Sequence, residues 1–211
     1  VAAGDMAGSL MALNGILMAL IKQRSTGKGD YIDLAMHDAL LAWTPHVLGP
    51  VFAEQRDPIP QQERSWGGAA FNNAYETKDG RFIMLGGVEP HFAENLLGKA
   101  GRPDLAELCH HPAGPVQDPV KAFLREFFKT KTLAEWDTWL ADIDVAWAPV
   151  RSFTEAIFDP ATSERGMLLR DDQGLEHLGV PIKFASYSIG HRGGHAHVAI
   201  ERGTYLDLRS Y

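Results

Sequence analysis

The feature that most constrains this chain is a nearly uninterrupted apolar pattern with helical spacing, which covers residues 6–22. Leucine, isoleucine, alanine and methionine occupy most faces of the expected helix, so it should be buried rather than amphipathic. Asn14 interrupts the pattern, and the apolar stretch 6–21 is shorter than the ~20 residues needed for a membrane span. The sequence therefore predicts a buried helix of a soluble protein and no membrane segment.

Downstream, helical and alternating patterns are mixed, which predicts an α/β fold. The Asp79-Gly80 pair indicates a β-hairpin turn, and Thr132 followed by Glu135 forms a capping-box signature. We expect strands at 31–35, 74–77, 81–85 and 145–150, and helices at 37–43, 90–97, 119–128, 133–140 and 154–157. A stretch rich in proline and charged residues, 49–68, is expected to be a linker.

The charge of the chain argues against a nucleic-acid-binding protein, and its cysteine content excludes a protein held by intrachain disulfides. The formal net charge of −7 argues against general nucleic-acid binding, which needs a basic surface. Cys109 is the single cysteine, so no intrachain disulfide can form. That usage fits a reducing compartment, and we expect a cytoplasmic protein.

For two histidine-containing motifs we prefer an explanation that involves no function. His191, His195 and His197 could in principle hold a metal, but no carboxylate or cysteine completes the set. We therefore expect no metal site. Cys109 followed by His110 resembles a nucleophile beside a base, but neighbours in sequence rarely point at each other.

Asp5, which lies between Gly4 and Gly8 just before the apolar helix, is open to two interpretations. In the first, Asp5 is the N-cap of the helix and accepts a hydrogen bond from the amide of Gly8. In the second, it is a reactive carboxylate that the helix N-terminus stabilises as an anion. The flanking glycines would then let a bulky ligand approach.

Eight segments, taken in order, resemble the family III CoA-transferases, which include formyl-CoA and carnitine CoA-transferases, and their α-methylacyl-CoA racemase relatives. The similarity runs from the start of the chain to about Phe184. The first part carries a Gly-Asp followed by small residues, a Thr-Gly-x-Gly turn and a Met-x-Asp segment. These are Gly4-Asp5-Met6-Ala7-Gly8, Thr26-Gly27-Lys28-Gly29 and Met36-His37-Asp38. The second part comprises 74–81, 101–105, 147–150, 159–167 and 181–184.

The resemblance implies that Asp5 is catalytic. In the transferases the matching aspartate attacks an acyl-CoA thioester and passes CoA to an acceptor acid through an aspartyl-CoA thioester. In the racemases it exchanges the α-proton of the acyl group, opposite a histidine. Gly86-Gly87-Val88-Glu89-Pro90 is similar to a racemase segment whose glutamate supports that histidine, so Glu89 favours the racemase. On physics alone, Glu89 would instead be a capping carboxylate at the start of the next helix.

The family also implies an architecture. Its members are interlocked homodimers with a Rossmann-like large domain and a smaller α+β domain. Residues 1–65 would belong to the large domain, 66–152 to the small domain, and 153–211 would return towards the large one. We expect Gly4, Gly8, Gly86 and Gly87 to line the acyl-CoA site, and we expect no cofactor beyond the CoA of the substrate.

Two departures qualify the expected activity. The racemase histidine and most CoA-binding residues belong to an N-terminal part of the family that this sequence lacks. The tail 193–211 does not match the usual family ending. A non-catalytic fragment therefore stands as the alternative from a different class.

Overall fold

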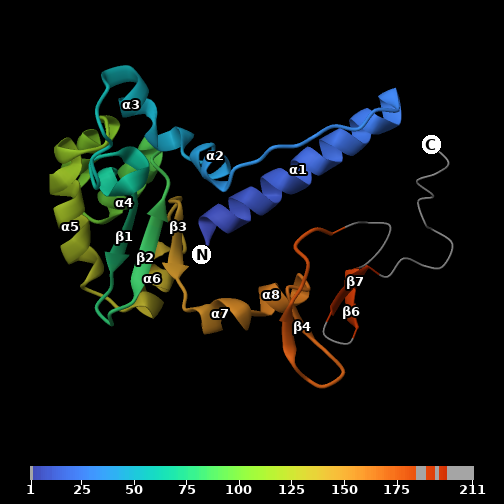
Figure 1. The fold of residues 1–211 in the computed structure, drawn as a ribbon. Coiled ribbons are helices and arrows are strands. Elements are labelled where there is room, and N and C mark those ends of the chain that lie inside the picture. The colour runs from blue at the N-terminus through green and yellow to red at the C-terminus, as the bar shows by residue number, and fades with distance from the viewer. Residues whose placement is uncertain (1, 184–188, 193–194, 199–211) are drawn as a thin grey trace. The chain divides into compact units, whose positions relative to one another are not determined.

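A computed structural model describes residues 2–183, 189–192 and 195–198. The chain forms two compact units, residues 1–150 and 151–211. The first unit holds a helical arm and a small antiparallel sheet covered by helices, and the second holds short helices and two β-hairpins (Figure 1).

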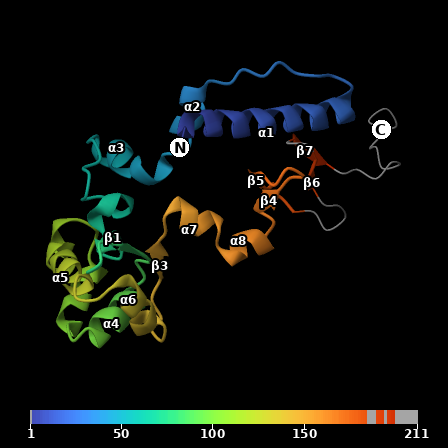
Figure 2. The ribbon, with the colours of Figure 1, turned by 90° about the horizontal axis from the view of Figure 1, so that it is seen from below.

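The arm consists of the long helix α1 (Ala3–Thr26) and the short helix α2 (Met36–Leu41). Gly27 ends α1 in the left-handed conformation, at φ 73°, which suits glycine. The segment 28–35 then runs back along α1, and Ile32 packs against Gly15 (Figures 1 and 2). The strand expected at 31–35 is wrong, because this segment packs on a helix and pairs with no strand of the described residues.

The helix predicted from residues 6–22 is present and longer than expected, but its predicted burial is wrong. Only Ala7 and Gly8 are buried in α1, and apolar side chains such as Met18 and Ile21 are 70 % and 67 % exposed. The returning segment 28–35 and α2 pack against one side of α1. By length and composition alone, α1 could cross a membrane, although core helices of soluble proteins meet the same criteria.

The stretch expected to be a linker has local structure. It contains α3 (Gly49–Glu54) and the turn η2 (Arg64–Gly68), and η1 (Pro45–Val47) directly precedes it. Gly67 has a φ of 83°, and a Cβ on Gly68 would lie 2.3 Å from the carbonyl oxygen of Gln62, so both glycines are needed for this tight turn.

The sheet has the order β1 (Asn72–Glu76), β2 (Phe82–Gly86), β3 (Trp147–Val150), and both pairings are antiparallel. The predicted hairpin is confirmed: Glu76 pairs with Phe82, and Gly80 takes a φ of 71° in the turn. Within the described residues every strand pairing is antiparallel.

Helices pack around this sheet and enclose the hydrophobic core. They are α4 (Pro90–Lys99), η3 (Pro103–His110), η4 (Pro115–Gln117), α5 (Asp118–Phe128) and α6 (Leu133–Leu140). Trp136 is fully buried, and its indole nitrogen donates to the carbonyl of Phe128 at 2.8 Å. The capping box predicted for Thr132 and Glu135 is confirmed at the start of α6.

The second unit begins with α7 (Phe153–Ile157) and α8 (Pro160–Glu164). Hairpins β4 (Leu168–Arg170) with β5 (Glu176–Leu178), and β6 (Ile189–Arg192) with β7 (His195–Val198), follow. The side chains of the three histidines considered as metal ligands lie outside the described residues.

Candidate functional site

Asp5 lies in the first turn of α1 and is exposed to solvent. The residue at the N-cap position is Ala2, and no side chain caps this helix end, so the interpretation of Asp5 as an N-cap is wrong. Among the described residues, the Asp5 carboxylate makes no hydrogen bond or ion pair. The positive end of the helix dipole lies beside it. Asp5 is therefore a carboxylate that interacts with the helix dipole but has no hydrogen-bond or ion-pair partner among the described residues.

Gly4 and Gly8, on either side of Asp5, have different surroundings. A Cβ on Gly4 would meet nothing within 4 Å, so the surface beside Asp5 is open at this residue. Gly8 is buried, and a Cβ there would lie 3.0 Å from the Met36 side chain of α2. Gly8 thus permits close packing within the arm, while Gly4 leaves room for a ligand.

Glu89 is the N-cap residue of α4. Glu89 therefore occupies the capping position at the start of α4, but its side chain accepts no hydrogen bond from the helix amides. Glu89 is exposed, and its carboxylate has no partner among the described residues. Like Asp5, it is available to another molecule.

Gly86 and Gly87 connect β2 to this helix start. The amide of Gly86 donates to the carbonyl of Ala146 at 2.9 Å, and a Cβ on Gly86 would point into open space. Gly87 is buried, and a Cβ there would lie 2.5 Å from two ring carbons of Phe92 and 2.8 Å from the Cβ of Ala146. Gly87 therefore has a packing role that sets the path of the chain into Glu89.

The expected site residues form two local groups. Gly4, Asp5 and Gly8 lie in the first turns of α1, while Gly86, Gly87 and Glu89 lie between β2 and α4. Within the described part of the chain, no hydrogen bond or ion pair joins Asp5 to Glu89. Each group presents one unpaired carboxylate next to at least one glycine.

The remaining motif, Cys109 with its neighbouring histidine, is not a nucleophile and base pair. Burial raises the pKa of the Cys109 thiol to about 11, and the side chain packs against the core. His110 instead lies 3.2 Å from a carboxylate oxygen of Glu94 and 3.5 Å from one of Glu107. The described residues contain no group of histidine, cysteine and acidic side chains that could hold a metal ion.

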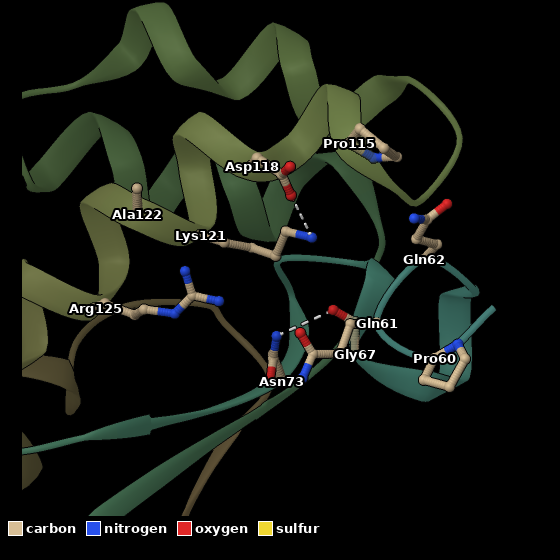
Figure 3. Close-up of a pocket in the computed structure, with 10 residues that line it drawn as sticks. All are labelled: Pro60, Gln61, Gln62, Gly67, Asn73, Pro115, Asp118, Lys121, Ala122 and Arg125. Carbon is tan, nitrogen blue, oxygen red and sulfur yellow. Dashed lines mark hydrogen bonds and ion pairs between the residues drawn. The ribbon is translucent and has the colours of Figure 1, made fainter.

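Sequence reasoning missed a cavity of about 660 Å³ between α5 and the 60–67 segment (Figure 3). Its lining includes Asp118, Lys121 and Arg125, which follow one face of α5 at helical spacing. That spacing was readable in the sequence, but it is equally typical of a solvated helix face. Only the facing segment, with Gly67 and Asn73, turns this face into a cavity.

Comparison with known proteins places this arrangement in a class. The fold superposes on a solved CAIB/BAIF family protein from Brucella suis with a TM-score of 0.67, at 25% identity over 88% of this chain and 49% of that one. The chain therefore has the α/β fold of a CAIB/BAIF family protein. The match to the model for CoA-transferase family III covers residues 1–192, so the chain belongs to that family.

Curated relatives include racemases, CoA-transferases and an isomerase. The chain is 30% identical over 170 residues to the human (Homo sapiens) α-methylacyl-CoA racemase, covering 79% of this chain and 43% of that protein. It is 28% identical over 206 residues to the acetyl-CoA:oxalate CoA-transferase of Acetobacter aceti, covering 96% of this chain and 52% of that protein. The chain thus spans about half the length of the curated relatives it matches, and they include both racemases and transferases.

Proposed function

We propose that this chain is part of an acyl-CoA-processing enzyme in which Asp5 is the catalytic carboxylate. The observation that carries the proposal is the state of Asp5: it is exposed at a helix N-terminus, has no partner among the described residues, and lies next to the open surface at Gly4. A carboxylate in that position can approach a thioester or its α-carbon. CoA enters as part of the substrate, and the chemistry needs no other cofactor.

The reaction we favour is proton exchange at the α-carbon of a 2-methylacyl-CoA. One group removes the α-proton, the electron pair moves into the thioester carbonyl as an enolate, and a second group returns a proton to the opposite face. Asp5 would be one of these groups, and a histidine of a segment outside this sequence the other. In a homodimer, Glu89 would orient that histidine and set its tautomer from the partner subunit. The unpaired carboxylate of Glu89 supports this role.

The second candidate is CoA transfer, favoured by the similarity to the oxalate CoA-transferase. Here an Asp5 oxygen attacks the thioester carbonyl, the C–S bond breaks, and CoA leaves as a thiolate. The thiolate then attacks the aspartyl carbonyl of the mixed anhydride and releases the first acid. Attack of the acceptor carboxylate on the aspartyl-CoA thioester, followed by return of the thiolate, yields the new acyl-CoA and free Asp5.

A third candidate, from another class, is a folded but non-catalytic fragment. It is favoured by the coverage of about half of each curated relative. The intact mass of the protein purified from its natural source, compared with the gene's reading frame, distinguishes it from the two enzymes.

Solvent deuterium exchange tests the enzymatic proposal. The native protein that contains this chain, incubated in D₂O with a 2-methylacyl-CoA, should incorporate deuterium at the α-position. Asp5→Asn should slow that turnover by about 100-fold or more, the scale for loss of a positioned proton-transfer group. The matched control is Asp33→Asn, which removes an exposed carboxylate from the segment that returns along α1. Near-normal turnover of the Asp5→Asn protein would refute the assignment.

Glu89 separates the two chemistries. In a racemase, Glu89→Gln should slow α-deuteration, whereas Glu94→Gln, on the same helix, should leave it unchanged. In a transferase, CoA would move to a free acid without α-deuteration, and mass spectrometry after chemical trapping should find an adduct at Asp5. The second result would overturn the racemase preference and reduce Glu89 to a positioning role.

A further inference from the structure

The cavity beside α5 carries a positive charge on a chain that is acidic overall. Two cations, Lys121 and Arg125, and one carboxylate, Asp118, line it, whereas the whole chain has a net charge of −7. Its volume of about 660 Å³ lies within the ~300–1,000 Å³ range of small-molecule sites. A local excess of positive charge in a concave surface concentrates anions.

Lys121 is the unusual member of this lining. Its side chain is only 5 % exposed, and its ammonium nitrogen lies 2.7 Å from a carboxylate oxygen of Asp118. Burying an ammonium group is unfavourable unless its donors are satisfied. Lysine has three N–H donors, and Asp118, whose side chain is 63 % exposed, is the acceptor that the described residues provide. Donor capacity is therefore left for a ligand in the cavity.

Arg125 lies one turn further along α5 and extends into the same space (Figure 3). It forms no hydrogen bond or ion pair with any described residue. A guanidinium group offers a planar fork of donors that matches a carboxylate or a phosphate. On the facing side, Asn73 is held by a hydrogen bond from its amide nitrogen to the carbonyl of Gly67 at 3.3 Å, which fixes that wall.

We propose that this cavity is a binding site for a small anionic metabolite, whose phosphate or carboxylate group is bound by Lys121 and Arg125. The side chains of Asn73 and Gln61 lie within reach of the polar remainder of such a ligand. The proposal is independent of the chemistry at Asp5 and Glu89, because none of the expected site residues lines this cavity.

Titration of the 211-residue chain with inorganic phosphate, and separately with succinate, followed by ¹H–¹⁵N NMR at constant ionic strength, tests it. At least one of the two anions should cause saturable shifts in the side-chain amides of Asn73 and Gln61. Tighter binding of phosphate would indicate a phosphorylated ligand, and tighter binding of succinate a carboxylate. Equal binding would support an oxyanion site that accepts both.

Variants on α5 make the test specific. Arg125→Gln should weaken binding by about 10-fold or more, the scale for losing a charge-assisted hydrogen bond, and Asp118→Asn should strengthen it. The matched control is Lys129→Gln, which removes the same charge just past the end of α5 and outside the cavity. Because Lys121 is buried and its replacement could destabilise the fold, the exposed Arg125 is the residue to replace. The proposal is overturned if neither anion gives saturable shifts, or if Lys129→Gln weakens binding as much as Arg125→Gln.

Discussion

Replacing Gly87 by alanine should destabilise the small sheet and its helices, although only one methyl group is added. Carbon atoms in ordinary contact lie about 3.5–4.0 Å apart, whereas the new Cβ would lie 2.5 Å from two ring carbons of Phe92. The other obstacle is Ala146, with its Cβ at 2.8 Å, whose carbonyl is held by the amide of Gly86. Both neighbours are tied to regular structure, so neither can move freely.

The expected cost of Gly87→Ala is about 1–3 kcal/mol in the free energy of unfolding, the usual range for overpacking. For a chain of this size, that corresponds to a melting temperature lower by roughly 2–12 °C. Gly86→Ala is the matched control, because its Cβ would enter open space and Gly86 has no positive φ. It should leave stability unchanged or raise it by up to ~1 kcal/mol, through a smaller unfolded-state entropy.

Urea unfolding monitored by circular dichroism measures both variants under the same conditions. If Gly87→Ala unfolds at the same urea concentration as Gly86→Ala, the Phe92 ring must turn aside at no cost. The packing role of Gly87 would then be wrong, and the presence of glycine at this position would have to be explained by contact with a ligand.

Two further predictions concern the helices around the sheet. Thr132→Ala should lower the free energy of unfolding by ~1 kcal/mol, because it removes the hydroxyl that caps α6. Thermal unfolding measures this loss, with Thr138→Ala, inside the same helix, as the control. A loss no greater than that of Thr138→Ala would contradict the prediction. Cys109 should react with iodoacetamide at pH 8 more slowly than a free thiol by on the order of 100-fold, since burial raises its pKa to about 11 and the thiolate is the nucleophile. Its alkylation rate should rise as the pH is raised above 8, and a rate equal to that of a free cysteine at pH 8 would show that the thiol is not buried.

Local sequence signals predicted the small sheet and its helices well. The Asp79-Gly80 turn sets the register of β1 and β2, and the carboxylate of Asp79 also accepts from the amide of Leu133 at 3.2 Å, tying the turn to α6. Thr132 and Glu135 form the reciprocal bonds of a capping box. The turn and the capping box each involve residues close together in the sequence, so the types of those residues are enough to predict their geometry. The bond from Leu133 to Asp79 adds a single tertiary contact.

Features that depend on distant neighbours were predicted poorly. The alternation at 31–35 is compatible with a strand, but Ile32 packs against Gly15 of α1 instead. Asp5 and Glu89 both have the chemistry of capping residues, yet neither side chain caps its helix. The cavity at Lys121 depends on how the 60–67 segment folds over α5, and no periodicity within α5 reveals that segment.

The exposed apolar surface of α1 and the unpaired carboxylate of Asp5 in its first turn lie on the same helix and can be considered together. Apolar side chains along nearly the whole helix are about half exposed or more, far beyond the isolated exposed leucines of an ordinary surface. Burial against another surface is the stable arrangement for such a helix, and Asp5 lies in its first turn. In the proposed enzyme, such a cover would exclude water beside Asp5 and strengthen the electrostatic interactions of that site. A carboxylate in the first turn is stabilised by the helix dipole, and the catalytic role proposed for Asp5 would in addition use the open approach at Gly4.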